Sequence, residues 1–319
     1  MRRFLSRVLP LLLSFGLILN CTGCSTVLVL AGKARENSEA SSSVISESSA
    51  SSGVISTPVP TEDGDLRAFY TDVANAESVT VMVYMIGSDL ESEDGSATDD
   101  LLEMADAALS ENVHLVLETG GTETWWNDVC TDDESERFVI ENGDMTLLQS
   151  LGSMNMTDAD TLSDFIRFSA ESYPADRYEL ILWDHGGGTM TGFGYDELYE
   201  DTSLTLSSLS TALYNGGVQF DFIGFDACLM ATAEVAYALD PYADYLIASE
   251  ESEPGEGWAY KNWLTMLAED PAVPTAELGK KLADDFLEAY IFADMPTLSV
   301  LDLRYVPELS EVPSRHIHA

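Results

Sequence analysis

Basic side chains are scarce in this chain of 319 residues, where 14 Lys and Arg stand against 56 Asp and Glu, for a formal net charge of −42 at pH 7. Five of the basic side chains and one of the acidic ones lie within residues 1–36, so the rest of the chain carries 9 basic against 55 acidic side chains. A surface this negative repels phosphate backbones and anionic lipid heads, which excludes a nucleic-acid-binding protein. It favours cationic ligands, basic peptides or calcium.

Cysteine is also rare. Two of the four cysteines, Cys21 and Cys24, lie near the N-terminus, which leaves Cys130 and Cys228 for the body of the chain. One disulfide between these two is arithmetically possible, but a pair of cysteines does not make a disulfide framework.

No apolar run near the N-terminus is long enough to span a bilayer. Leu9–Leu19 has eleven residues and follows a basic start, which is typical of a signal-peptide core. The following Gly23-Cys24 resembles the cleavage junction of a bacterial lipobox, although Cys21 occupies the position where an aliphatic residue is usual. We therefore expect residues 1–24 to be a lipoprotein-type signal peptide with lipid attachment at Cys24. The alternative is ordinary secretion with two incidental cysteines.

Serine dominates the next segment, Ser38–Ser56, and prolines at positions 58 and 60 close it. Such a composition cannot bury enough apolar area to order itself. We expect residues 25–77 to be a flexible tether and residues 78–319 to form the folded domain, held at the bacterial cell surface through an N-terminal lipid anchor in the membrane.

The folded part alternates between strand and helix patterns. Strands are predicted at 79–86, 113–119, 137–141, 178–183, 220–225, 245–248 and 298–305, and helices at 99–110, 160–173, 204–214, 229–239, 258–267 and 275–291. This order implies a mostly parallel sheet with helices on both faces. Ligands of such sheets bind beyond the carboxyl ends of the strands.

Three chemically notable groups lie at these strand ends: His185, Cys228 and the acidic segment Glu250–Glu253. A cysteine at a strand-to-helix junction can be a nucleophile, because a helix N-terminus stabilises the thiolate. A histidine at a neighbouring strand end can transfer its proton. Taken singly, a buried cysteine is usually a small hydrophobic residue and a histidine among glycines is often a turn residue. Their joint occurrence at strand ends favours catalysis, whereas their spacing does not match a zinc site.

Two blocks carry a family resemblance. Residues 178–188 (YELILWDHGGG) and 222–232 (FIGFDACLMAT) resemble the signature blocks of the clostripain family of cysteine peptidases, within the caspase-like group. The resemblance covers about residues 78–305. It implies a caspase-like three-layer α/β/α sandwich and a cysteine endopeptidase.

The resemblance also implies roles for residues. Cys228 would attack the scissile carbonyl, His185 would transfer the proton, and the backbone N–H groups of Gly186 and Cys228 would form the oxyanion hole. Asp226 would bind a basic P1 side chain, with Arg preferred over Lys because a carboxylate can hold guanidinium with two hydrogen bonds. The alternative for Asp226 is a helix N-cap.

A second pocket carboxylate is expected from the acidic segment, with Glu250, Glu251 and Glu253 as the candidates. The expected partners are thus proteins or peptides with basic residues.

The chemistry itself needs no cofactor, but the resemblance raises calcium dependence. Residues 89–100 place carboxylates at positions 1, 3, 5 and 12 of a calcium-loop template, with Gly95 at position 7 instead of 6. We interpret this segment as a solvated acidic loop.

The family domain usually extends beyond the end of this chain, so a C-terminally truncated domain is expected. The alternative functions are a non-catalytic caspase-like binding module at the surface and, less favoured, a calcium-dependent adhesion or solute-binding lipoprotein.

Overall fold

The computed structural model describes residues 68–199, 202–290 and 296–307. Within these ranges the chain forms one eight-stranded sheet with the order β4-β3-β2-β1-β5-β6-β7-β8. The strands are β1 Val79–Ile86, β2 Val113–Gly120, β3 Ser135–Glu141, β4 Asp144–Gly152, β5 Arg177–Trp183, β6 Phe220–Asp226, β7 Ala243–Ala248 and β8 Ser299–Asp302. The five central strands, β2, β1, β5, β6 and β7, are parallel, and β3, β4 and β8 are antiparallel to their neighbours.

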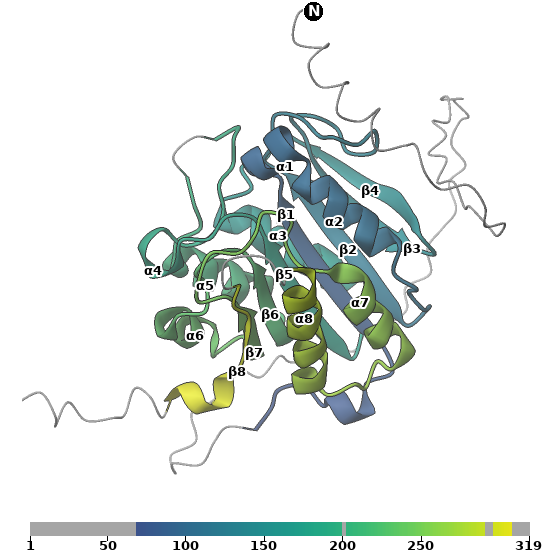
Figure 1. Cartoon of the computed structure of the whole chain (residues 1–319), viewed down its shortest axis with the longest axis vertical. Coiled ribbons are helices and arrows are strands. Elements are labelled where there is room, and N and C mark those ends of the chain that lie inside the picture. The colour runs from purple at the N-terminus through teal and green to yellow at the C-terminus, as the bar shows by residue number, and fades with distance from the viewer. Residues whose placement is uncertain (1–67, 200–201, 291–295, 308–319) are drawn as a thin grey trace, which may run out of the picture. The chain divides into compact units, whose positions relative to one another are not determined.

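Helices cover both faces of this sheet, as the sequence predicts. One face carries α2 (Ser96–Ala105), α7 (Tyr260–Glu269) and α8 (Thr275–Ala289), which lie in front of the strands in Figure 1. The other carries α3 (Ala159–Ser172), α5 (Leu206–Gly216) and α6 (Ala233–Leu239). Four short elements complete the described part: α1 (Ser88–Asp94), α4 (Gly188–Thr191), η1 (Val73–Asn75) and η2 (Leu303–Tyr305).

The continuous apolar run of β1 is explained by this three-layer arrangement. All eight residues of β1 are buried. Val81, Val83 and others of that parity pack into the core under α2, α7 and α8, whereas Met82 and Tyr84 pack into the core under α3 and α5. A strand that is buried on both faces has no polar side, so its sequence does not alternate.

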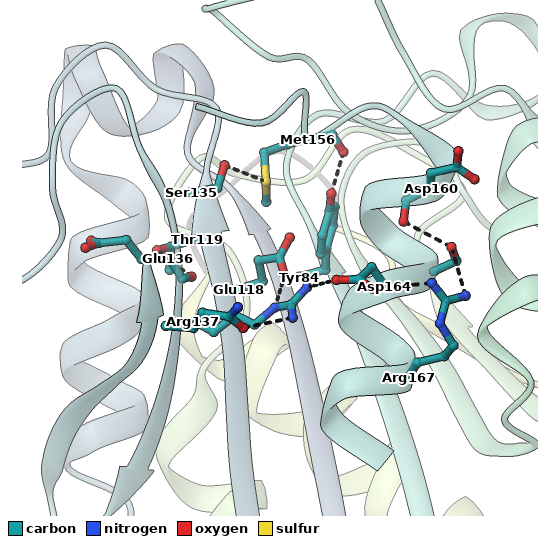
Figure 2. A network of polar contacts seen from close by, with 12 residues as sticks. Tyr84, Glu118, Thr119, Ser135, Glu136, Arg137, Met156, Asp160, Asp164 and Arg167 are labelled. Carbon is teal, nitrogen blue, oxygen red and sulfur yellow. Dashed lines mark hydrogen bonds and ion pairs between the residues drawn. The ribbon is translucent and has the colours of Figure 1, made fainter. Parts of the chain in front are cut away.

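A partly buried ion-pair network connects the edge hairpin β3–β4 to the rest of the domain. Arg137 of β3 lies between Glu118 of β2, at 2.6 Å, and Asp164 of α3, at 2.8 Å. Figure 2 shows these side chains, with Arg167 continuing the network along α3. Burial raises the pKa of Glu118 to about 7, although Arg137 counteracts this.

The segment before β1 belongs to the folded domain. The backbone N–H groups of Tyr70 and Thr71 donate to the Asp244 carboxylate, both at 2.9 Å, and Phe69 stacks on Tyr245. The end of the predicted tether at residue 77 therefore overlaps this ordered part. The predicted signal peptide, the lipid-attachment residue Cys24 and the Ser-rich segment lie outside the described residues.

No helix in the described ranges combines the length and the apolar character that a bilayer crossing requires.

The acidic segment at residues 89–100 is not a loop, so this interpretation was wrong. It forms α1 and the start of α2, joined at Gly95, whose φ of +76° ends the first helix. Glu91 and Asp100 are buried in this arrangement. Their carboxylates accept hydrogen bonds from the backbone N–H of Thr98 and from the indole N–H of Trp183, respectively. Their acidity suggested a solvated segment, but their role is structural.

Candidate active site

His185 and Cys228 occupy matching positions beyond two adjacent parallel strands. Trp183 of β5 is in register with Asp226 of β6, and each of the two candidate residues follows two positions later. The backbone N–H of Asp184 donates to the carbonyl of Asp226 at 3.2 Å, which extends the pairing past the strand ends. The prediction that both residues lie at carboxyl ends of neighbouring strands is confirmed.

Gly186 joins the two motifs. A Cβ atom at this position would lie 2.1 Å from the carbonyl oxygen of Cys228, so no other residue fits without moving the backbone. The hydrogen bonds around Gly186 use the N–H groups of Gly187 and Gly194. The N–H of Gly186 does not take part in these hydrogen bonds.

Cys228 lies in a tight turn and not at a helix N-terminus, which corrects the sequence prediction. The next residue, Leu229, has a φ of +65°, and α6 begins only at residue 233 instead of 229. The helix therefore cannot supply the field that would stabilise a thiolate. The Cys228 Sγ accepts a hydrogen bond from the backbone N–H of Glu253 at 3.2 Å.

Cys130 and Cys228 are both free thiols, so the possible disulfide between them does not form. They differ in environment. Cys130 is buried, and burial raises the pKa of its thiol to about 12, whereas Cys228 is partly exposed. Only the second has access to a substrate.

A cavity of about 180 Å³ opens beside the two candidate residues. Its lining consists of Leu90, Trp183, Asp184, His185, Asp226, Ala227, Cys228, Glu253, Pro254, Gly255 and Gly257. Among these lining residues of the described structure there are three carboxylates and neither Lys nor Arg. The cavity is therefore an acidic recess next to a thiol.

Asp226 is buried in the wall of this cavity. One of its carboxylate oxygens accepts a hydrogen bond from the backbone N–H of Trp258 at 3.0 Å and another from the Tyr260 hydroxyl at 2.8 Å. Burial raises its pKa to about 6, although these two donors counteract the effect. The alternative role as a helix N-cap is excluded, because Thr232 caps α6.

Glu253 is the pocket carboxylate that the acidic segment supplies. Neither of its buried oxygens, nor the indole N–H of Trp258, makes a hydrogen bond of normal geometry with another described residue. Burial and the neighbouring Asp226 raise its pKa well above the ordinary value. Two adjacent carboxylates without a cation are an unfavourable arrangement unless a proton or a positive ligand neutralises them.

The other two candidates from this segment, Glu250 and Glu251, do not line the cavity. Glu250 accepts a hydrogen bond from the Ser299 hydroxyl at the edge strand β8, and the side chain of Glu251 is exposed. We withdraw both from the predicted pocket.

Asp100 is a further buried carboxylate, close to Asp226, that the sequence did not place near the site. It accepts from the Trp183 indole N–H at 2.6 Å, and burial together with Asp226 raises its pKa well above the ordinary value. Gly257, with a φ of +68°, separates the two: a Cβ there would lie 2.8 Å from Asp100 Oδ2 and 3.0 Å from Asp226 Oδ2. A signal was present, since Asp100 interrupts the apolar stripe of its helix beside Leu101.

His185 is hydrogen-bonded through both its backbone carbonyl and its imidazole ring. Its Nε2 lies 2.7 Å from the Asp89 Oδ1, and its carbonyl accepts from the Gly194 N–H at 3.0 Å. Asp184, directly before it, is buried and accepts from the Tyr195 N–H. Burial raises the pKa of Asp184 to about 7, while His185 counteracts this.

The residues of the calcium-loop template do not fit a calcium site. Asp89 pairs with His185, Glu91 accepts from Thr98 and Trp126, and Asp100 accepts from Trp183, so the carboxylates do not converge. In the described ranges, no group of three or more His, Cys, Asp or Glu side chains is arranged to hold a metal ion.

A larger cavity of about 580 Å³ lies at the network of Arg137, Asp164 and Arg167. It contains neither His185 nor Cys228 in its lining. Both arginines are already paired with carboxylates. The smaller acidic cavity therefore remains the better candidate for chemistry.

Comparisons with known proteins agree with this geometry. Residues 83–314 match the family model described as the clostripain family. Clostripain of Hathewaya histolytica is 35% identical over 123 residues, which is 33% of this chain and 23% of clostripain. The match thus spans about a quarter of the length of that curated relative.

Two solved structures share the fold. A secreted C11 cysteine protease of Bacteroides thetaiotaomicron, in complex with an irreversible peptide inhibitor, has a TM-score of 0.60 at 22% identity, covering 73% of this chain and 68% of that one. An inactive zymogen C11 protease of Parabacteroides distasonis has a TM-score of 0.56 at 27% identity, covering 73% and 64%. The predicted α/β architecture is confirmed by this likeness.

Proposed function

The chain belongs to the clostripain family of cysteine peptidases, and on this premise we propose that it hydrolyses peptide bonds after basic residues, with Arg preferred. One observation carries the proposal. His185 and Cys228 border a cavity whose wall contains the buried carboxylates Asp226 and Glu253 and, among the described residues, no cation. A nucleophile beside a recess of buried carboxylates suits a substrate that brings a positive charge to neutralise them.

The proposed reaction follows from the two strand ends. The Cys228 thiol gives its proton to His185, and the sulfur bonds to the scissile carbonyl carbon. The N–H groups of Gly186 and Cys228 would donate to the resulting oxyanion. The imidazolium then returns the proton to the amide nitrogen, the C–N bond breaks, and water hydrolyses the thioester to restore the thiol.

The preference for Arg rests on the pocket charges. A guanidinium group that reaches Asp226 and Glu253 would replace the proton that these neighbouring carboxylates otherwise share. Its planar fork of donors matches a carboxylate better than an ammonium group does. The net charge of −42 also draws basic peptides toward the protein.

The cellular setting is part of the proposal. The N-terminal pattern with Cys24 supports export and a lipid anchor in the membrane, so that the peptidase would act on peptides outside the cytoplasm. The chemistry as proposed uses no cofactor. Dependence on calcium stays a prediction from the family resemblance, and no residue set is assigned to it.

The test is cleavage of fluorogenic peptides that end in Arg, Lys, Asp or Leu by the purified chain, with calcium or with a chelator. We expect cleavage after Arg, its loss in Cys228→Ala, and a selective loss for Arg peptides in Glu253→Gln. Glu251→Gln is the matched control, because this nearby glutamate is exposed and lies outside the cavity.

A preference for Asp or Leu would keep the enzyme and refute the basic pocket. If no peptide is cleaved but Arg peptides still bind to the purified chain, the alternative of a non-catalytic binding module is favoured.

A further inference from the structure

We propose that Asp89 is the positioning residue of His185: it accepts the Nε2–H of the imidazole and thereby leaves Nδ1 as the nitrogen that exchanges the proton with Cys228. This inference rests on the function proposed above. The observation behind it is the 2.7 Å contact between Asp89 Oδ1 and His185 Nε2, formed by residues 96 positions apart in the sequence.

Sheet topology brings the two residues together. β1 and β5 are adjacent and parallel, with Met85 in register with Trp183, so the segments after both strands leave the sheet at the same edge. Asp89 lies in the first turn of α1 directly after β1, and Leu90, the next residue, lines the cavity at Cys228. Helix α1 is therefore one wall of the site.

The backbone that carries Asp89 is fixed by the neighbouring strand. The N–H groups of Gly87 and Ser88 donate to the carbonyls of Gly120 and Gly121, at 2.8 and 3.1 Å. Ser88 has a φ of +49°, a left-handed conformation that costs free energy for a residue with a side chain. The fold thus maintains an unfavourable turn where α1 starts, and this turn directs Asp89 toward His185.

A buried glutamate fixes the middle of the helix. Glu91 is fully buried, and its carboxylate accepts from the Thr98 N–H at 2.8 Å and from the Trp126 N–H at 2.6 Å. These bonds join α1 to α2 and to the loop after β2. Asp89 is therefore presented by a rigid element and not by a mobile loop.

The contact determines the tautomer. A carboxylate can only accept, so Nε2 carries the hydrogen and the lone pair of neutral His185 lies on Nδ1. Nδ1 takes the thiol proton and later delivers it to the leaving amine, while Asp89 keeps the hydrogen bond from Nε2–H. Asp89 touches neither substrate nor thiol in this scheme, so it acts through the histidine.

The expected effect is moderate. The side chains of His185 and Asp89 are 44% and 45% exposed, so water screens the pair. We expect kcat for an Arg peptide to fall about tenfold in Asp89→Ala with KM nearly unchanged, well below the loss known for a buried triad aspartate. Asp89→Asn should lose activity as well, because its amide can also donate to Nε2 and so no longer fixes the tautomer. Glu93→Ala, an exposed carboxylate on the same helix, is the control and should match the parent chain.

The deciding measurement is ¹⁵N NMR of the full chain labelled at its four histidines, which reports the tautomer independently of activity. We expect the Nε2–H form for His185 in the parent chain, and a mixture of tautomers in Asp89→Asn and in Asp89→Ala. An Nδ1–H form in the parent chain, or an unchanged tautomer in Asp89→Ala, would overturn the inference. If no peptide is cleaved, the proposed function fails while the NMR result still decides the role of Asp89.

Discussion

Replacing Asp226 by Asn should stabilise the domain while it removes the preference for Arg. Asp226 is 4% exposed, and burial raises its pKa from 3.8 to about 6. At about 1.4 kcal/mol per pKa unit, the ionised carboxylate costs the folded state about 3 kcal/mol. An amide oxygen can still accept from Trp258 and Tyr260, so the substitution removes the charge and keeps these hydrogen bonds.

The pH window follows from the direction of the shift. Between about pH 4 and pH 6 the folded state holds a proton on Asp226 that the unfolded state has released, so the contribution of Asp226 to stability falls as the pH rises through this range and is constant above it. The advantage of Asp226→Asn should therefore be near zero at pH 4 and reach its full size at pH 8. For a domain of this size, about 3 kcal/mol corresponds to roughly 6–12 °C in Tm.

The assay is thermal unfolding at pH 4, 6 and 8 in a Cys228→Ala background, which prevents self-digestion. Asp164→Asn is a control of opposite sign, because Arg137 holds the pKa of Asp164 below its ordinary value. That substitution should cost stability at pH 8 and less at pH 4. The reasoning is refuted if Asp226→Asn is less stable than its parent at pH 8, or if the difference does not change with pH.

Two further outcomes are expected. Gly186→Ala should abolish cleavage without unfolding the domain, because its methyl group would lie 2.1 Å from the Cys228 carbonyl oxygen and push the turns at His185 and Cys228 apart. A peptide cleavage assay and circular dichroism measure these two effects. Retained activity would contradict the expectation. Iodoacetamide at pH 7.5 should alkylate Cys228 and spare Cys130, because burial raises the pKa of the Cys130 thiol to about 12. Peptide mass mapping identifies the labelled cysteine. Preferential labelling of Cys130 would contradict the assignment of the nucleophile.

Much of the fold was predictable because the central strands are buried on both faces. The nearly continuous apolar run of β1 and the mainly apolar segments of β5 and β6 are long enough to be identified from the sequence alone. β4 was missed, since most of its nine residues are exposed at the sheet edge and show no periodic pattern. The helix predicted from residue 229 begins later, because the turn at Cys228 takes a left-handed residue that no local signal announces.

The site was predictable only where chemistry coincides with a strand end. His185 and Cys228 follow β5 and β6 directly, so topology brings them together. Asp89 looked like part of an acidic loop, because its contact with His185 depends on how α1 leaves the adjacent strand. Choosing Glu253 over Glu250 likewise requires the path of the loop after β7, which sequence spacing does not give.

The acidic residues of the chain therefore have two separate effects. Most carboxylates of the described residues are exposed, and the excess of acidic over basic residues in the chain acts on substrate approach and solubility. The carboxylates of Asp100 and Asp226 are buried beside Gly257, and that of Glu253 neighbours Asp226, so that their mutual repulsion and loss of hydration oppose folding. A cluster that costs stability in the free protein can bind a cation strongly, because the ligand relieves a penalty that already exists. Neutralising Asp226 should therefore stabilise the free protein and weaken recognition of Arg at the same time.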